Sequence, residues 1–214
     1  MPDSSNAGAG ATTAPAERLA PKQLQILRSA YKIMGLKGGI RFALQDVADD
    51  AGVSKALLLY HFKTKESLVL ATLQWALDTV AARIRRAIDP IETAEAKVGV
   101  MLDTIFAQPE LNRRFYLVYT DLIGQAARVE AFSAVAATFH DTVNDMYADI
   151  AAQGMREGAF FARDPHIAAA AMRALIDGMF IQWLLERDWQ SSHVTYREMC
   201  KRAILAYLRA GESR

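Results

Sequence analysis

The chain has 214 residues, of which 52% are hydrophobic and 23% are charged, and its formal net charge is +1. This composition is typical of a soluble globular protein of one or two domains and excludes a highly charged disordered chain. The single cysteine, Cys200, excludes an intramolecular disulfide framework and favours a reducing cytoplasm. We expect Cys200 to be a half-buried small apolar residue on a late helix; a redox sensor is the alternative.

Residues 1–17 (MPDSSNAGAGATTAPAE) are rich in small residues and proline, which predicts a flexible N-terminal arm. They contain no continuous apolar run, so we do not expect a secretory signal here. No later stretch reaches the roughly 18 uncharged apolar residues that a membrane span needs. We therefore expect a cytoplasmic protein without a membrane partner.

The next residues predict three helices. Residues 21–36 repeat apolar side chains at helical spacing, and glycines follow them, which predicts an amphipathic helix that ends there. Residues 44–51 (LQDVADDA) also place their apolar side chains on one helical face. A turn at 51–53 containing Gly52 follows, and Ser54 then suits the N-cap of another short helix. Two short helices joined in this way predict a helix-turn-helix, whose second helix enters the DNA major groove.

The charge distribution supports a DNA-binding role for this segment. The window 18–65 holds nine basic side chains and three acidic ones, so the remainder of the chain is net acidic. A local basic cluster of this kind attracts a polyphosphate. Periodicity alone does not distinguish a DNA-binding element from two short core helices of an ordinary bundle, and the basic cluster favours DNA binding. Its basic residues are Arg18, Lys22, Arg28, Lys32, Lys37, Arg41, Lys55, Lys63 and Lys65.

The segment from Gly52 to Leu68 (GVSKALLLYHFKTKESL), preceded by DVADDAG at 46–52, resembles the TetR family of bacterial transcriptional regulators. The likeness covers about the first 70 residues, and the remainder only in layout. It implies an all-helical homodimer. Residues 18–66 would form the three-helix DNA-binding domain, and residues 67–214 a larger helical domain that binds a ligand and dimerises.

The resemblance also implies roles for individual residues. Three side chains would hydrogen-bond phosphates, namely Ser54, Tyr60 and His61. Four would face base edges, namely Lys55, Ala56, Leu57 and Leu59. Lys65 would lie at the N-terminus of the fourth helix, where backbone amides also point at a phosphate.

Two departures from the family pattern affect how the DNA sequence would be read. Ala43 stands where many relatives have a threonine that caps the second helix. The run at 56–59 is Ala-Leu-Leu-Leu, where relatives commonly have Gly-Thr-Leu-Tyr. Leu57 and Leu59 remain able to contact thymine methyl groups. We expect base readout to depend on Lys55, with Arg41 and Gln45 near the second helix as substitutes.

The rest of the chain also predicts helices. Residues 65–88 form one long amphipathic pattern, which would leave the first domain, enter the second and so link ligand to DNA. No alternating strand pattern occurs after residue 88, so we predict an all-α protein. The further helices are expected near 91–107, 110–127, 129–154, 165–187 and 195–210.

Residues 165–187 are apolar nearly all round, which indicates burial on more than one side. We expect the second side to contact another subunit, so that this helix and the one near 195–210 form half of a four-helix dimer bundle. This is also where the family's dimer interface lies. The alternative is a simple intramolecular core. A dimer would present two reading helices to half-sites about one helical turn apart.

The helices near 91–155 are rich in aromatic residues, which could line a pocket for a small molecule. Aromatics outnumber charges there, so we expect a moderately large apolar or amphipathic effector. For each residue taken singly, a place in the core is the alternative. The aromatic candidates are Trp75, Phe106, Phe115, Tyr116, Tyr119 and Phe139. The candidate polar anchors are Asp121, Gln125, His140, Asn144 and Asp177.

These features favour a ligand-responsive transcriptional regulator. A repressor that binds a palindromic operator as a dimer, and that its effector releases, is the preferred form. The alternative is a helical small-molecule-binding module with a degenerate DNA head. We expect no enzyme, metal or cofactor, because the sequence lacks a Gly-rich phosphate loop, a GxSxG motif and metal-ligand spacing.

Overall fold

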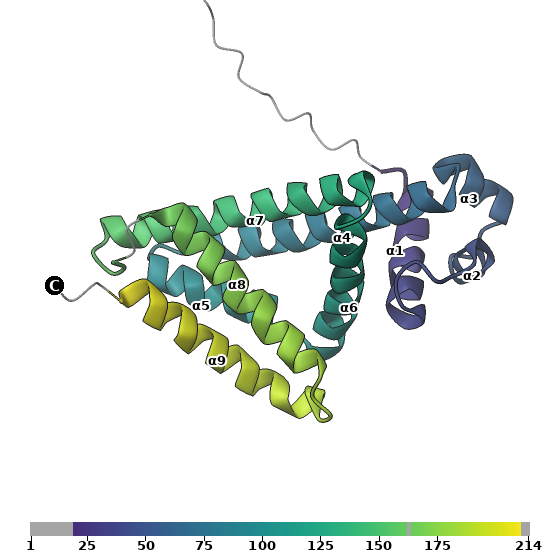
Figure 1. Ribbon diagram of the computed structural model, residues 1–214. Coiled ribbons are helices and arrows are strands. Elements are labelled where there is room, and N and C mark those ends of the chain that lie inside the picture. Colours follow the sequence, from purple (N-terminus) through teal and green to yellow (C-terminus); the bar gives the residue numbers. More distant parts are fainter. Residues whose placement is uncertain (1–18, 162–163, 211–214) are drawn as a thin grey trace, which may run out of the picture.

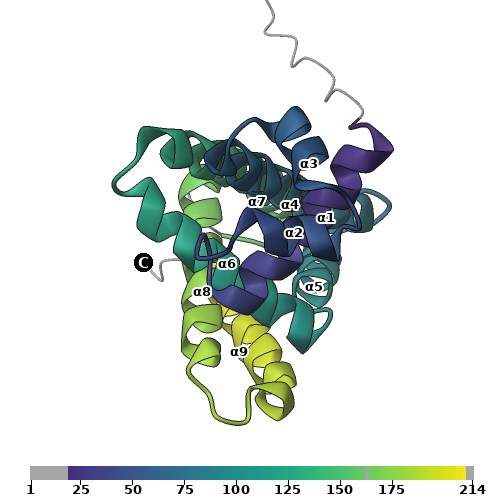
Figure 2. The same ribbon diagram turned by 90° about the vertical axis from the view of Figure 1, so that its right-hand side faces the viewer.

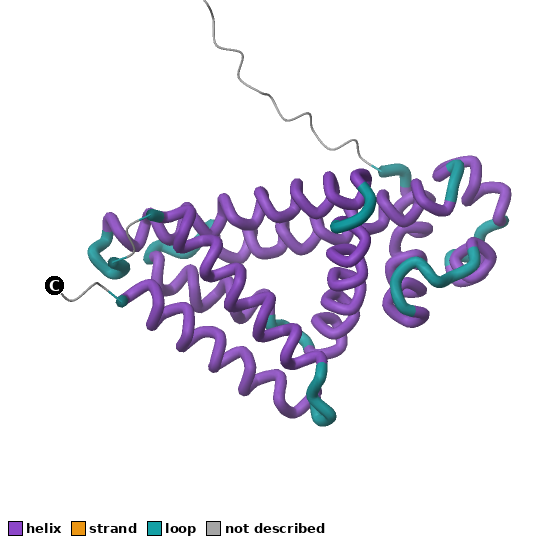
Figure 3. Tube along the Cα trace, viewed as in Figure 1, coloured by secondary structure: helices purple, strands orange, loops and turns teal. Residues whose placement is uncertain are grey.

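The computed structural model describes residues 19–161 and 164–210, and all regular structure in these ranges is α-helical (Figure 3). The predicted all-α class is therefore confirmed. The arm predicted for residues 1–17 lies outside the described residues. In chain order the helices are α1 (Pro21–Lys37), α2 (Leu44–Asp50), α3 (Lys55–Phe62), α4 (Lys65–Ile88), α5 (Ala94–Ile105), α6 (Pro109–Ala126), α7 (Glu130–Arg156), α8 (Pro165–Leu184) and α9 (Trp189–Arg209).

Helices α1, α2, α3 and the first turn of α4 form a small unit at one end of the molecule, which we call the head (Figure 1). Figure 2 shows the head facing the viewer, with the C-terminal helices behind and below it. Its apolar centre contains Leu27 from α1, Val47 from α2, Leu58 from α3 and Leu68 from α4, all almost fully buried. The two short helices are thus held by the apolar faces that their sequences predict.

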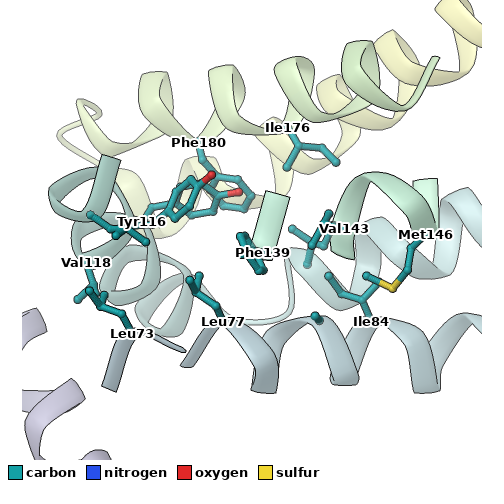
Figure 4. Close-up of a cluster of buried hydrophobic side chains, with 14 of the residues drawn as sticks. Leu73, Leu77, Ile84, Tyr116, Val118, Phe139, Val143, Met146, Ile176 and Phe180 are labelled. Atoms are coloured by element: carbon teal, nitrogen blue, oxygen red, sulfur yellow. The ribbon is translucent and has the colours of Figure 1, made fainter. Parts of the chain in front are cut away.

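Helices α4 to α9 form the larger unit, which we call the body. Helix α4 runs out of the head and lies alongside α7, and α7 also packs against α5, α6 and α8 (Figure 1). Side chains of four helices meet in the core, as Figure 4 shows for Leu77 of α4, Tyr116 of α6, Phe139 of α7 and Phe180 of α8. Because protein cores are close-packed, a displacement of any one of these helices changes the packing contacts of the other three.

One predicted boundary is wrong for an identifiable reason. Helix α9 begins at Trp189, well before the predicted start near 195. The indole N–H of Trp183 donates to the carbonyl of Trp189 at 2.6 Å, which joins the end of α8 to the start of α9. The helix expected near 129–154 corresponds to α7, and Gly154 lies near its end, where a side chain would overlap the ring of Phe160. Its role is close packing.

Helix α8 is the helix in the described residues that is long and apolar enough, by length and composition alone, to cross a membrane. It carries two charged side chains near its centre, Arg173 and Asp177, which pair with each other. Met172, Phe180 and Trp183 are fully buried against the rest of the body. These contacts describe a core helix of a globular unit.

Cys200 on α9 is completely buried, more so than the sequence predicted. Burial raises the pKa of its thiol to about 12. The thiol therefore stays protonated at neutral pH, and it is the thiolate that reacts with oxidants. This agrees with a small apolar core residue and disfavours the redox-sensor alternative.

Candidate DNA-binding surface and ligand cavity

The start of α3 has the predicted cap. Ser54 has extended backbone angles, and its hydroxyl oxygen accepts a hydrogen bond from the N–H of Leu57 at 3.1 Å. A serine hydroxyl also carries a proton that it can donate. The same side chain can thus fix the helix start and donate to a phosphate oxygen.

Helix α3 has one buried and one exposed side. Leu58 and Phe62 are buried, whereas Lys55, Ala56 and Tyr60 are exposed, with Tyr60 keeping 69% of its surface. The ring of half-buried His61 lies 5.3 Å from that of Tyr60. Half-buried Leu57 and Leu59 were both expected to face bases.

Leu59 differs from that expectation because it packs against the core. Residues two apart on a helix do not share a face, so Leu57 and Leu59 cannot present equal surfaces to a groove. The exposed side chains of α3 are those of Lys55, Ala56 and Tyr60, and half-buried Leu57 is not among the residues packed against the core.

The turn between α3 and α4 contains a strained residue that sequence reasoning missed. Lys63 has φ 59° and ψ −55°, and the N–H of Thr64 donates to the carbonyl of Phe62 at 2.6 Å. This is a γ-turn of the rare, strained form. Thr64 then caps α4, its hydroxyl oxygen accepting from the N–H of Ser67 at 3.0 Å. The turn brings two capped helix N-termini into one short segment, and it exposes Lys63.

The basic side chains of the head fall into two groups. Lys32 pairs with Asp50 at 2.5 Å and Lys37 pairs with Asp46 at 2.8 Å, so these lysines neutralise acids of α2. The hydrogen bond from Lys37 holds the pKa of Asp46 below its usual range. Other cations of the head make no ion pair with a described residue. They include Arg41, Lys55, Lys63 and Lys65.

Lys65 opens α4 as predicted, and its ammonium lies 4.6 Å from the ring centre of Phe42. A cation held over an aromatic face is attracted by the ring quadrupole. The start of α2, in contrast, lacks a side-chain cap because Ala43 occupies the N-cap position. Asp46 compensates in part by accepting from the N–H of Ala43 at 2.8 Å. Gln45, expected as a base-reading substitute, is exposed and donates to Asp49 at 2.7 Å.

The head meets α6 at a close contact. Gly39 has φ 56°, and any side chain there would overlap Asp121 of α6. A cavity of about 340 Å³ adjoins this contact, and its lining includes Arg41, Asp121 and Gln125. Burial raises the pKa of Asp121, and nearby Arg41 opposes the shift. Asp121 and Gln125, predicted as ligand anchors, therefore lie between head and body.

Five of the predicted ligand-site residues line a cavity inside the body. The cavity has a volume of about 40 Å³ and lies among α4 to α8. The rings of Phe115 and Tyr119 are stacked at 5.7 Å, and Tyr116 stacks on Phe180 at 3.9 Å. We call this the central cavity. The predicted residues that line it are Phe115, Tyr116, Tyr119, Phe139 and Asp177.

Two larger hollows share residues with the central cavity. One, of about 240 Å³, also uses Tyr116, Tyr119 and Asp177 and extends to Ile181. The other, of about 140 Å³, shares Arg83 and reaches the predicted residue Trp75. Each of the two hollows thus adjoins the central cavity through shared lining residues.

Three further predicted ligand residues, Phe106, His140 and Asn144, do not line the central cavity. Phe106 stacks on Phe180 at 4.2 Å and belongs to the core behind the cavity wall. His140 is exposed and contacts the amide of Asn144 on its own helix. Adjacent helical residues point in different directions, so Phe139 can line the cavity while His140 faces away from it.

The central cavity contains two arginines that sequence reasoning missed. Arg173 of α8 is 6% exposed; its Nε donates to Asp177 at 3.1 Å and its Nη2 donates to the hydroxyl of Tyr119 at 2.6 Å. Its Nη1 is buried without a partner, as is Nε of Arg83 on α4. An unpaired buried donor costs about 1–3 kcal/mol, and more when it is charged. The available signal was an Arg–Asp pair four residues apart in an otherwise apolar helix.

Protonation states around Arg173 follow from burial and charge. Burial alone would lower the pKa of Arg173, but Asp177 and the neighbouring tyrosines outweigh it and raise the pKa. Burial also raises the pKa of Tyr116, whose hydroxyl donates to Asp177 at 3.3 Å. At neutral pH the cavity thus holds the charged guanidinium group of Arg173 and neutral phenols.

A helix-turn-helix head with unpaired outward cations, joined to a cavity-bearing helical body, defines the general class of helical DNA-binding regulators. Residues 26–72 match the sequence profile described as bacterial regulatory proteins of the tetR family. Residues 94–209 match the profile of the C-terminal part of BetI-type transcriptional repressors. The second match covers more than half of the chain. The chain belongs to the TetR family.

Curated relatives match parts of the chain. It is 32% identical to the regulator CymR of Pseudomonas putida over 88 residues, 41% of this chain and 43% of CymR. It is 27% identical to the repressor KstR2 of Mycolicibacterium smegmatis over 137 residues, 64% of this chain and 65% of KstR2. The chain thus spans less than two thirds of the length of either relative. The regulator TtgR of Pseudomonas putida is 26% identical over 170 residues, 77% of this chain and 80% of TtgR.

Solved structures share the fold over most of the chain. A transcriptional regulator from Saccharomonospora viridis, in complex with choline, has a TM-score of 0.78 and 22% identity, covering 85% of this chain and 94% of its own. A TetR-family transcriptional regulator from Rhodococcus sp. has a TM-score of 0.73 and 27% identity, covering 87% of this chain and 98% of its own.

Proposed function

We propose that this protein is a ligand-responsive transcriptional repressor that acts in the cytoplasm and binds a palindromic operator as a homodimer. The observation that carries the proposal is the exposed surface around the α3–α4 turn. Lys55, Lys63 and Lys65 have no ionic partner there among the described residues, and Ser54 and Thr64 cap two helix N-termini beside them. Phosphate contacts of this kind fix the register of a protein on DNA, and base contacts specify the sequence.

The proposed dimer would form through α8 and α9. A recognition helix of eight residues makes few contacts alone, whereas two helices related by a two-fold axis read two half-sites. Exposed apolar side chains on α8 and α9 support a second copy as the partner of this face. They include Ile167, Ile181, Val194 and Tyr207.

The proposed control uses the contacts of α4 and α6. Helix α4 lines the central cavity and begins in the head, and α6 lines the cavity and contacts the head at Gly39. An effector that binds a rearranged body better than the operator-binding form would shift the population towards the former. Couplings of this type are typically about 1–3 kcal/mol.

DNA binding is tested with the full chain and the intergenic DNA of its own locus. We expect competitor-resistant binding whose affinity falls steeply with salt. Lys65→Ala should weaken binding to all DNA and reduce the salt slope by roughly 1. Lys55→Ala and Leu57→Ala should instead change the ranking of operator variants. Lys97→Ala, in the body, is the matched control and should leave the DNA affinity, its salt slope and the ranking of operator variants unchanged.

A helical small-molecule-binding module with a degenerate head is the second candidate, favoured by Ala43 and by the packing of Leu59 against the core. Indifference to DNA sequence at every salt concentration would support it against the repressor. A monomer in sedimentation experiments at the protein concentrations used for DNA binding would contradict the proposed dimer. We propose no catalytic role.

A further inference from the structure

The central cavity has hydrogen-bond donors that no group in the body uses. Nη1 of Arg173 is buried without a partner, although the side chain as a whole is 6% exposed. Nε of Arg83, which lines the same cavity, is also buried without a hydrogen-bond partner. The carboxylate of Asp177 already accepts hydrogen bonds from Nε of Arg173 and from Tyr116. An additional acceptor would therefore satisfy groups that are now unpaired.

The charges of the lining lead to the same conclusion. The described residues that line the cavity carry two guanidinium groups, of Arg83 and Arg173, and one carboxylate, of Asp177. A buried charge is costly unless it is paired. The planar guanidinium group matches the geometry of a carboxylate. The cavity is thus complementary to an organic anion.

The spaces beside these arginines are apolar or aromatic. Tyr116 and Ile181 border the hollow of about 240 Å³, which also meets Asp177, and Trp75 and Leu111 border the hollow of about 140 Å³, which also meets Arg83. Phe139 also lies 4.9 Å from the guanidinium carbon of Arg173. A charged centre flanked by apolar walls fits a molecule with one anionic group and an extended apolar body.

We propose that the effector is an amphipathic carboxylate, whose oxygens accept hydrogen bonds from Nη1 of Arg173 and Nε of Arg83 and whose aliphatic or aromatic body fills the adjoining hollows. This inference rests on the proposed function and narrows its apolar or amphipathic effector to an anion. The central cavity, at about 40 Å³, is too small for such a body. Binding would displace aromatic side chains between α4, α6 and α8, which is the rearrangement that release of DNA requires.

The proposed ligand of this chain is opposite in charge to choline, which is bound in the structure of the Saccharomonospora viridis regulator. Choline is a cation, and two guanidinium groups would repel it. A neutral molecule of the same shape can accept hydrogen bonds from the free N–H groups but brings no negative charge to balance the second guanidinium group. The charge of the ligand therefore decides its affinity for this cavity.

The test compares ligands that differ only in the polar group. The probes are octanoate and 4-phenylbutanoate, their primary amides, and octyltrimethylammonium. Dissociation constants are measured by calorimetry on the full chain, and release of operator DNA is measured in the same samples. We expect at least one carboxylate to bind saturably and to release the DNA, with its amide and the ammonium compound roughly tenfold weaker or worse.

Variants of the two arginines test the assigned contacts. Arg173→Lys and Arg83→Gln should each raise the dissociation constant of the carboxylate roughly tenfold and reduce its advantage over the amide. Arg86→Gln is the matched control, because Arg86 lies on α4 but is exposed and does not line the cavity. It should change binding less than about threefold. Arg83→Gln remains informative if Arg173→Lys fails to fold.

Three results would overturn the inference. They are equal or tighter binding of the amide or the ammonium compound, no saturable binding of either carboxylate, and an unchanged carboxylate preference in Arg83→Gln. A measurement of operator binding by the ligand-free protein distinguishes a failure of the carboxylate inference from a failure of the proposed repressor function. Specific DNA binding without carboxylate selectivity would remove only the inference. Carboxylate binding by a protein that ignores its own intergenic DNA would remove the repressor proposal instead.

Discussion

The head and the body use basic side chains in opposite ways. In the head, Lys55 and Lys63 are exposed, and Asp46 and Asp50 of α2 are neutralised by other lysines. In the body, Arg173 is buried with one N–H group left unpaired. Exposed cations interact with DNA over a Debye length and are weakened by salt, whereas buried cations are screened much less. Burial, rather than residue type, thus separates long-range attraction from selective recognition.

The largest effect is expected from the wall that supports the cavity. Phe180 is completely buried and stacks on both Phe106 and Tyr116. Phe180→Ala should lower the free energy of unfolding by about 3–5 kcal/mol in urea titrations, because it leaves a cavity in a packed core. Leu36→Ala, at a 68% exposed position of the head, is the control and should change it by less than about 0.5 kcal/mol. Similar losses in both variants would refute the assignment of Phe180 to the core.

Two ion pairs give the most direct comparison between the regions. Asp177→Asn removes the partner of buried Arg173 and should cost about 3 kcal/mol, the lower end for a broken buried pair, since the Asp177 side chain keeps 28% exposure. Asp50→Asn removes the partner of Lys32, whose own side chain keeps 52% exposure, and should cost less than about 1 kcal/mol. Both are measured by chemical denaturation at low and high salt. Equal losses in the free energy of unfolding of the two variants would contradict the proposed difference between the ion pairs of the head and the body.

The strained turn of the head offers a smaller effect that separates stability from DNA binding. Lys63→Gly should raise the free energy of unfolding by about 1 kcal/mol, because the relieved strain exceeds the entropy that glycine loses. Lys63→Ala keeps the strained backbone and should give no gain. Both variants lose the same charge, so both should weaken DNA binding equally. A stability gain in the alanine variant would contradict the strain at this residue.

The smallest effect is a pH dependence that arises in the body. Burial, followed by nearby Arg197, lowers the pKa of His193, whose Nε2 lies 2.9 Å from Oδ1 of Asn112. As the pH falls, His193 is protonated in the unfolded chain before it is protonated in the folded protein. Its contribution to the free energy of unfolding is therefore fully present above the ordinary pKa of 6.5 and declines as the pH falls below that value towards the lowered pKa.

Thermal unfolding between pH 7.5 and 5.5 measures this decline, which for one proton cannot exceed about 1.4 kcal/mol per pH unit. His193→Gln removes the titrating group, and the slope, rather than the absolute stability, is compared. An identical slope in the variant and the original protein would assign the pH dependence to another group.

The head was largely predictable from the sequence because its signals are local. Ser54 next to a glycine turn fixes the start of α3, and the absence of a cap at Ala43 follows from its side chain alone. The backbone of Lys63 was not predictable, because most lysines avoid positive φ. The packing of Leu59 was also hidden, since it depends on the rest of the head.

The cavity was only partly predictable because it depends on how distant helices meet. Aromatic density located Phe115, Tyr116 and Phe139, yet the same signal selected Phe106, which belongs to the core. Periodicity cannot say which neighbour a helical face meets. Arg173 was missed for a related reason: its burial is a property of the assembled helices, not of its position in the chain.

The contact between Gly39 and Asp121 restricts how this protein can diverge. No residue larger than glycine fits at position 39 unless the side chain of Asp121 moves, and the positive φ of this position also disfavours other residues. Gradual evolutionary change in the fit between the two units must therefore arise on the α6 side. Descendants of this chain that differ in inducibility should carry their substitutions around Asp121 and retain the glycine.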